Sequence, residues 1–213
     1  MLISAITVAT LAIVGYCLCV RRDTWRSRWE AGATFSIAME GCALLLLTPW
    51  AASQLGPALH SLLGLWNVQQ LAGWLCLIAG VIGNIYHMLV RLTAAPHVWP
   101  VMRKHLLVPV GLGIAMLLVA FFNSGREFEP DMFNRLNGDR WLTAFEVAAG
   151  ALLLFLSGYV GRLMVALRPD RRARATLVLY LAAMAFAVTA CVVSLKQQII
   201  LKRRKPQKTV WHY

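Results

Sequence analysis

The stretch LISAITVATLAIVGYCLCV, residues 2–20, carries no charged residue and is followed at once by Arg21 and Arg22. An α-helix needs about 20 apolar residues to cross a hydrocarbon core of roughly 30 Å, and in lipid it satisfies its own backbone hydrogen bonds. A cleaved secretory signal has positive charge before the apolar run and a small-residue cleavage site after it, and this segment has neither. It therefore predicts an uncleaved membrane-spanning helix whose basic end faces the cytoplasm.

Five further apolar stretches follow along the 213-residue chain, at residues 31–53, 68–90, 106–122, 142–166 and 176–195. Hydrophobic residues make up 59% of the chain, charged residues only 14%, and the mean hydropathy is +0.63, which excludes an ordinary soluble domain. The expected fold class is all-α, a polytopic transmembrane helical bundle of about six spans. It forms one domain over residues 1–201, followed by a short basic tail over 202–213, because the polar connections are too short to bury a second core.

The distribution of basic residues predicts the orientation, because cytoplasmic connections retain Lys and Arg during insertion. With the N-terminus outside, the outer connections hold only Arg126, Arg135 and Arg140. The inner connections hold Arg21, Arg22, Arg26, Arg28, Arg91, Arg103, Lys104, Arg162, Arg168, Arg171, Arg172 and Arg174. An even number of spans also places the basic tail outside, against the same rule. One explanation is that the basic residues of the earlier connections fix the orientation, so that the tail is carried to the outside with the last span. The other is that one stretch is re-entrant and does not cross, and 106–122 is the shortest candidate. Six spans place more of the basic residues inside.

Three polar residues inside the apolar stretches form the candidate intramembrane site. Glu40 lies well within the second stretch, in SIAMEGCALLLL, where a carboxylate costs about 2.5 to 3.5 kcal/mol. Asn84 and His87 lie on one face of the third stretch, and that face continues to Arg91. A carboxylate, an amide and an imidazole at similar depth suit a proton or ligand site. The alternatives are an interhelical hydrogen bond from Glu40, and extension of His87 and Arg91 to the inner headgroups.

The basic tail offers a candidate contact with lipid. The net charge is +12, but the basic residues are spread over connections and tail instead of forming one basic and aromatic surface, which argues against nucleic acid as a partner. Near an anionic membrane each basic residue contributes about 1 kcal/mol, so the run Lys202, Arg203, Arg204 and Lys205 predicts contact with anionic lipid headgroups. A stop signal at the end of the last helix explains the same run.

Signatures of catalysis and of cofactor binding are absent from the sequence. The chain has no G-x-S-x-G, no phosphate-binding G-x-x-x-x-G-K, no H-E-x-x-H and no dinucleotide-binding glycine pattern. Its five cysteines all lie in apolar stretches without the spacing of metal ligands, and cysteine in such places behaves as a small hydrophobic residue. We therefore expect no enzymatic activity, no metal and no cofactor.

Three segments carry a resemblance to other proteins: LLLLTPW at 44–50, WNVQQLAGWLCLIAGVIG at 66–83 and RPDRRARATLVLYLAA at 168–183. In these segments the chain resembles multi-span integral membrane proteins of actinobacteria and actinobacteriophages whose function is uncharacterised. The resemblance implies a bacterial cytoplasmic membrane, and it includes no active-site motif.

The function expected from these patterns is that of a non-enzymatic integral membrane protein that acts through protein or lipid contacts. Its partners would be the lipid bilayer, with anionic headgroups, and a membrane-protein partner or further copies of the chain. One alternative is a small transporter or channel that uses Glu40, Asn84 and His87. Another is a phage-type membrane-permeabilising protein, which the small size and multiple spans suggest.

Overall fold

The computed structural model describes residues 2–25, 27, 30–124, 128, 140–166 and 178. The chain divides into two compact units, Met1–Leu167 and Arg168–Tyr213, and every described residue except Val178 belongs to the first. In the described ranges all regular structure is helical. The helices are α1 (Leu2–Val20), the short 3-10 helix η1 (Arg22–Thr24), α2 (Ala31–Leu46), α3 (Pro49–Leu63), α4 (Val68–Leu92), α5 (Ala95–His105), α6 (Leu107–Asn123) and α7 (Arg140–Ala166).

Four of the predicted helices are found close to their predicted bounds. Helix α1 coincides with the stretch 2–20, and α4, α6 and α7 each begin and end within two residues of the stretches 68–90, 106–122 and 142–166. The all-helical fold class is thus confirmed for the described part of the chain. The stretch 176–195 and the tail 202–213 lie outside it, apart from Val178.

The single helix predicted over 31–53 is wrong, because the chain turns through 82° between α2 and α3. Pro49 lacks a backbone N–H, and its ring disfavours helical geometry in the preceding residue. Thr48 accordingly adopts an extended conformation, with φ −75° and ψ 148°, and its hydroxyl accepts a hydrogen bond of 3.1 Å from the backbone N–H of Ala51. The same Thr48-Pro49 pair therefore ends one helix and caps the next.

The connection between the predicted stretches 68–90 and 106–122 is partly helical, because residues 95–105 form helix α5. Its first turn holds Pro96, whose fixed φ suits the start of a helix. The axes of Pro96–His105 and Leu107–Asn123 are bent by 49° at Leu106. Pro109 accounts for this bend, since a proline ring collides with the carbonyl four residues earlier, here that of His105.

Length and apolar composition identify the helices that are able to cross a membrane. Helices α4 and α7, with 25 and 27 residues, meet both criteria. The bent pairs α2 with α3 and α5 with α6 meet them only when each pair is counted as one span. By length and composition, two helices of the described residues, or up to four when each bent pair is counted once, are thus able to cross a membrane, and α1 is a shorter apolar helix.

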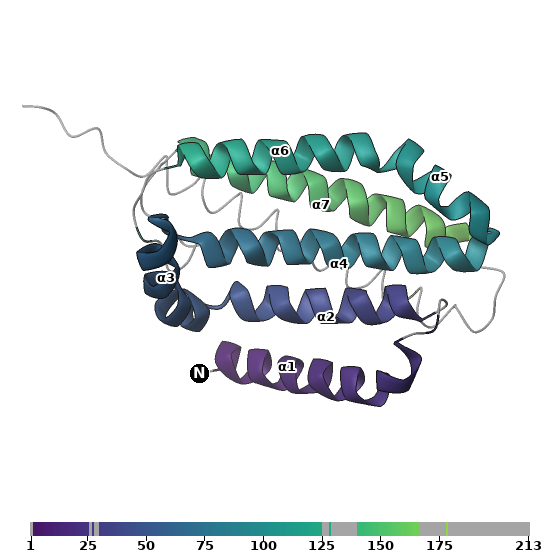
Figure 1. The fold of residues 1–213 in the computed structure, drawn as a ribbon, viewed down its shortest axis with the longest axis horizontal. Coiled ribbons are helices and arrows are strands. Elements are labelled where there is room, and N and C mark those ends of the chain that lie inside the picture. The colour runs from purple at the N-terminus through teal and green to yellow at the C-terminus, as the bar shows by residue number, and fades with distance from the viewer. Residues whose placement is uncertain are drawn as a thin grey trace, which may run out of the picture. The chain divides into compact units, whose positions relative to one another are not determined.

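Helix α4 is the centre of the first unit, since α2, α3, α5 and α7 all pack against it. Helix α1 packs on α2, and α6 packs on α7, so the long helices lie side by side in the order α1, α2, α4, α7, α6 (Figure 1). Between α4, α6 and α7 the core is closed by aromatic contacts: the Phe145 ring lies 6.4 Å from those of both Trp74 and Phe121. Ile78, Ile85, Leu117 and Leu156 fill the same core and are almost fully buried.

Glycines set the distance between the antiparallel helices α2 and α4. A Cβ on Gly83 would lie 3.2 Å from the carbonyl oxygen of Gly32 and 3.3 Å from the backbone nitrogen of Ser36. A Cβ on Gly80 would lie 3.3 Å from the carbonyl oxygen of Ser36 and only 2.8 Å from Cγ of Glu40. The two backbones are thus in near contact, as small residues allow in membrane helix pairs.

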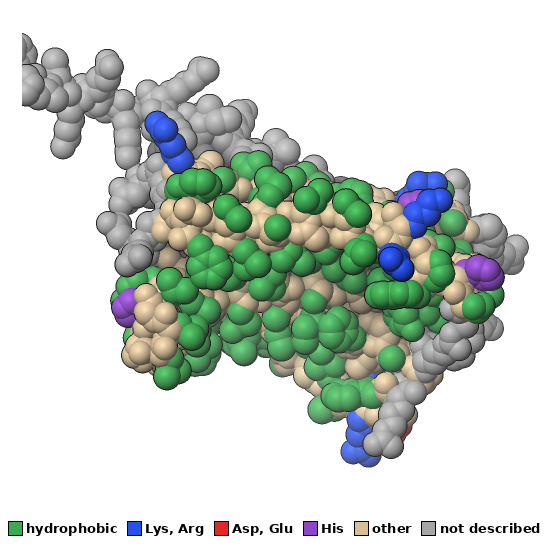
Figure 2. All heavy atoms as spheres, turned by 45° about the horizontal axis from the view of Figure 1, so that its top comes forward, with side chains coloured by type: hydrophobic (Ala, Val, Ile, Leu, Met, Phe, Trp, Pro, Cys, Tyr) green, Lys and Arg blue, Asp and Glu red, His purple; other side chains and the backbone are tan. Residues whose placement is uncertain are grey.

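On the face that Figure 2 shows, the coloured side chains between the two ends of the first unit are mostly hydrophobic. On α6, Leu112, Met116 and Val119 follow one another at helical spacing and are all more than half exposed. An apolar stripe of this kind on a peripheral helix suits contact with lipid or with another helix.

Most of the charged residues that the structure describes lie at one end, which we call the basic end: the C-terminal ends of α1, α4 and α7, the start of α2, and α5 (Figure 1 shows these helices). There Glu30 joins three helices, because its carboxylate lies 3.0 Å from Arg21 and 3.5 Å from Arg91. Arg103, Lys104 and Arg162 are exposed at the same end. The described residues of the three predicted inner connections thus share one end of the unit.

The glycine contact between α2 and α4 leads to a stability prediction. We expect Gly83→Ala to lower the free energy of unfolding by about 1 to 3 kcal/mol, because the added methyl meets backbone atoms that are unable to move aside. Gly158→Ala on α7 is the matched control, since a Cβ there has no neighbour within 4 Å and alanine favours helix by up to about 1 kcal/mol. Unfolding in mixed micelles, followed by circular dichroism, measures both; equal stabilities would contradict the prediction.

Candidate functional site

Glu40 lies in the middle of α2. It is at the edge of the contact between α2 and α4, which we call the α2–α4 seam. Its Oε1 accepts a hydrogen bond of 2.8 Å from the hydroxyl of Ser36, one turn earlier on the same helix. Its Cγ lies against Gly80, and the residue as a whole is exposed. Because Gly80 has no side chain, there is room for the side chain of Glu40 to lie against the Gly80 backbone at the edge of the seam.

Asn84 follows Gly80 by one turn of α4 and therefore lies on the same face of that helix. It is half-buried. No hydrogen bond joins its amide to Glu40, although the two residues lie about one helical turn apart along the seam. The structure thus brings Glu40 and Asn84 to neighbouring levels without a direct bond.

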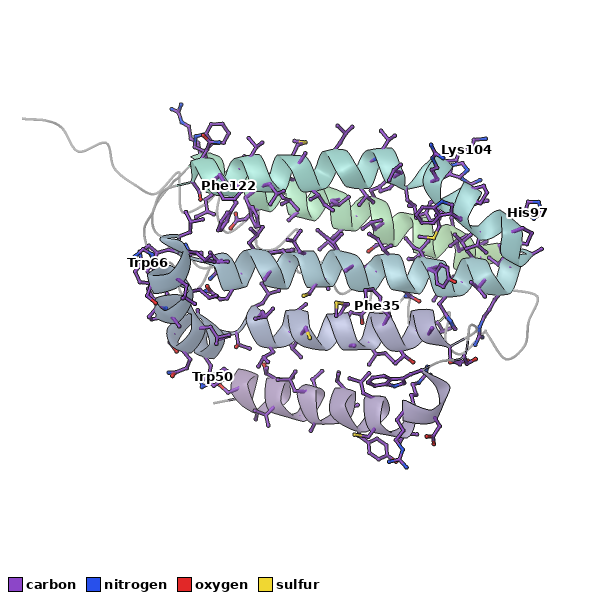
Figure 3. All side chains as sticks on the ribbon, in the orientation of Figure 1. Phe35, Trp50, Trp66, His97, Lys104 and Phe122 are labelled. Carbon is purple, nitrogen blue, oxygen red and sulfur yellow. The ribbon has the colours of Figure 1, made fainter. Side chains whose placement is uncertain are left out.

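His87 lies at a different level from Glu40. A Cβ added at Gly32 of α2 would lie 3.1 Å from Cβ of His87, so His87 faces α2 at the level of Gly32. Eight residues separate Gly32 from Glu40, and at 1.5 Å per residue they span about 12 Å along the helix. The three predicted site residues therefore share the α2–α4 seam (Figure 3 places Phe35 between these two helices), but His87 lies too far along it to share a ligand with Glu40.

The chemistry available at Glu40 is that of one carboxyl group beside one hydroxyl. Among the described residues no group of three or more His, Cys, Asp or Glu lies together so as to hold a metal ion. The second carboxyl oxygen of Glu40 has no hydrogen-bond or ion-pair partner among the described residues. The site is thus suited to accepting a hydrogen bond or exchanging a proton.

A second polar cluster was not predicted and lies at the other end of α4. Asn67, Gln69 and Gln70 are all buried there, and both amide atoms of Gln69 lack a hydrogen-bond partner within the described residues. The cluster is closed by stacked rings of His60 and Trp66, whose centroids lie 3.9 Å apart. Figure 3 shows Trp66 at the end of the unit opposite Lys104.

The signal for this cluster was present in the sequence. Two adjacent glutamines in the first turn of a long apolar helix are unusual, but a first turn is normally close to water, so they look like an exposed helix start. Helix α3 folds back beside them: a Cβ on Gly56 would lie 3.9 Å from Oε1 of Gln69. Helix α3 thus buries these glutamines, although their position at the start of α4 in the sequence suggests that they are exposed.

The remaining predicted contact, Lys202, Arg203, Arg204 and Lys205, lies outside the described residues. Comparison with known proteins gives no further guide to the site, because no protein-family model, no curated protein and no solved structure matches the chain. Any statement about function therefore depends on the geometry described above.

The buried amide of Gln69 leads to a second stability prediction. An unpaired buried amide costs about 1 to 3 kcal/mol, so replacing it with an apolar side chain of similar length removes that cost. We expect Gln69→Met to raise the free energy of unfolding by about 1 kcal/mol or more, and the exposed Gln54→Met to leave it unchanged. Thermal unfolding in detergent compares the two; a loss of stability in Gln69→Met would refute the expectation.

Proposed function

We propose that the chain is a non-enzymatic integral membrane protein that acts by binding another membrane-spanning helix at the Glu40 edge of α2. The observation that carries this proposal is that Glu40, an exposed residue in the middle of an apolar helix, has only one of its carboxyl oxygens hydrogen-bonded among the described residues. A carboxyl group facing hydrocarbon costs about 2.5 to 3.5 kcal/mol on insertion scales. A donor from a partner helix at the same depth would remove most of that cost.

The residues around Glu40 support a helix as the partner. Ile37 and Leu44 lie three residues before and four after Glu40, so they continue the same edge, and both are half-buried. One carboxyl oxygen already has a partner in Ser36, which leaves the other for an incoming Ser, Thr, Asn, Gln or Lys side chain. Because Glu40 is a single polar residue in an otherwise apolar edge, its hydrogen bond would fix how the partner helix is aligned along α2.

The membrane arrangement that belongs to this proposal has six spans, with the N-terminus outside, in a bacterial cytoplasmic membrane. Helices α1, α2, α4, α6 and α7 are five of them, the stretch 176–195 is the sixth, and α3 and α5 lie toward opposite faces. The shared position of Arg21, Arg91, Arg103, Lys104 and Arg162 at the basic end supports it, because cytoplasmic connections are enriched in basic residues.

Transport is the second candidate function, and the neighbouring levels of Glu40 and Asn84 are the observation that favours it. A proton-exchanging carboxyl beside an amide, half-way along two closely packed helices, is a plausible element of a proton or cation path. The two functions differ in what they require of Glu40: helix contact needs only a hydrogen-bonding group, whereas proton exchange needs the carboxyl itself.

Cysteine cross-linking in membranes tests the contact. In a chain whose native cysteines are replaced, we expect Leu44→Cys on the Glu40 edge to form a cross-linked adduct, and Leu45→Cys, exposed on another face of α2, to form none. Adding Glu40→Leu should abolish the adduct, while Glu40→Gln should keep it, because glutamine still forms the hydrogen bond. The adduct's mass then distinguishes a second copy from another protein.

Two results would count against the contact. An adduct that survives Glu40→Leu would show that the carboxyl has no part in it. Absence of an adduct, together with a cation or proton flux in proteoliposomes that is lost in Glu40→Gln, would favour transport instead. Unchanged flux in Glu40→Gln would exclude that use of the residue.

Thiol labelling in intact cells tests the membrane arrangement. Six spans predict that single cysteines at Ser124 and near Lys208 are both modified by an impermeant reagent, since both would lie outside. Labelling at Ser124 alone, with Lys208 reactive only after permeabilisation, would give an odd number of crossings and a cytoplasmic tail.

A further inference from the structure

Helix α5 presents two different faces to its surroundings. One face packs on the unit: Val98 is 4% exposed, and the ring of His105 lies 6.3 Å from that of Tyr159 on α7. The opposite side carries Trp99, 67% exposed, and Arg103 four residues later on the same face. Lys104 is also exposed, and Figure 3 shows it near the end of α5 that adjoins α6.

The cations on this helix have no partner of opposite charge among the residues that the structure describes. The segment APHVWPVMRKH contains no acidic residue. Of the described carboxylates at the basic end, Glu30 pairs with Arg21 and Arg91, and Asp23 pairs with Arg22. Arg103 and Lys104 form no ion pair within the described residues. Arg162, one turn after Tyr159 on α7, is a further exposed cation with no ion pair in the described part of the chain.

The position of α5 next to the apolar helix α6 indicates which anion would lie near Arg103 and Lys104. Helix α6 exposes the apolar stripe of Leu112, Met116 and Val119, and α5 is bent from it by 49° at the N-terminal end. If α6 lies in hydrocarbon, α5 leaves it obliquely at the level of the headgroups. There an indole prefers the boundary between apolar and polar layers, and Arg and Lys meet lipid phosphates.

We propose that α5 is an interfacial helix that binds the headgroups of anionic phospholipids through Arg103 and Lys104, with Trp99 seated at the same level. Charge complementarity and the continuity of α5 with an apolar helix select lipid over an acidic protein segment. The inference rests on the membrane placement proposed above, but it is independent of the Glu40 contact. It also places lipid recognition within the folded unit, apart from the basic tail.

Spin-labelled lipids in proteoliposomes of the full chain test this site. The measurement is the ratio in which labelled phosphatidylglycerol and labelled phosphatidylcholine become motionally restricted at the protein surface. We expect Arg103→Gln with Lys104→Gln to lower the preference for phosphatidylglycerol at least about threefold, since each such cation attracts anionic lipid. Arg103→Lys should retain the preference, as should Arg140→Gln, which removes an exposed cation at the start of α7, at the other end of the unit.

Each other result overturns the inference. An unchanged preference in the α5 pair, or an equal loss in Arg140→Gln, would remove the assignment to α5. Loss of the preference on adding inorganic phosphate, but not chloride at equal ionic strength, would show a site for free anions. Absence of any restricted phosphatidylcholine would refute the membrane placement itself, and is thereby distinguishable from failure of the α5 site alone. Circular dichroism of every variant verifies that the helices are intact.

Discussion

The near contact between the backbones of α2 and α4 is the constraint on which the rest of the described structure depends. Helix α4 touches α2 on one side and the aromatic core of α6 and α7 on the other, so its position fixes both halves of the unit. Gly80 and Gly83 make this distance possible. Lipid supplies no hydrophobic force between helices, so close packing of this kind is the main source of cohesion for helices within a membrane.

The same seam determines what Glu40 is able to do. Because Gly80 has no side chain, the carboxyl of Glu40 passes over it to the edge of the helix pair instead of being enclosed between the helices. The Ser36 hydroxyl donates to one carboxyl oxygen, and the other has no hydrogen-bond partner among the described residues. A larger residue in place of Gly80 would change the direction of Glu40 as well as the spacing, so packing and the candidate contact are two results of one local geometry.

The sequence predicts much of the fold and only part of the candidate site. Apolar runs locate α1, α4, α6 and α7, because a helix buried in lipid needs little more than length and hydrophobicity. Hydropathy averages over several residues, and it therefore missed the turn that Pro49 imposes, although Thr-Pro is a known start of a helix. Helical periodicity placed Asn84 and His87 on one face of α4, but it contains no information on which residues of α2 lie opposite each of them. The burial of Gln69 depends on α3 folding back, which no local pattern predicts.

The attachment of α1 has a consequence for local opening. Its main neighbour is α2, where Val14 fits into the gap above Gly41, and Arg21 adds an ion pair with Glu30 that is partly open to solvent. Most of the remaining surface of α1 is exposed and apolar. Helix α1 is thus able to separate from the others while the packing of α2, α4, α6 and α7 persists. Its amide hydrogens should exchange through this partial opening well before those of α4, and a molecule that covers α1 would slow exchange there first.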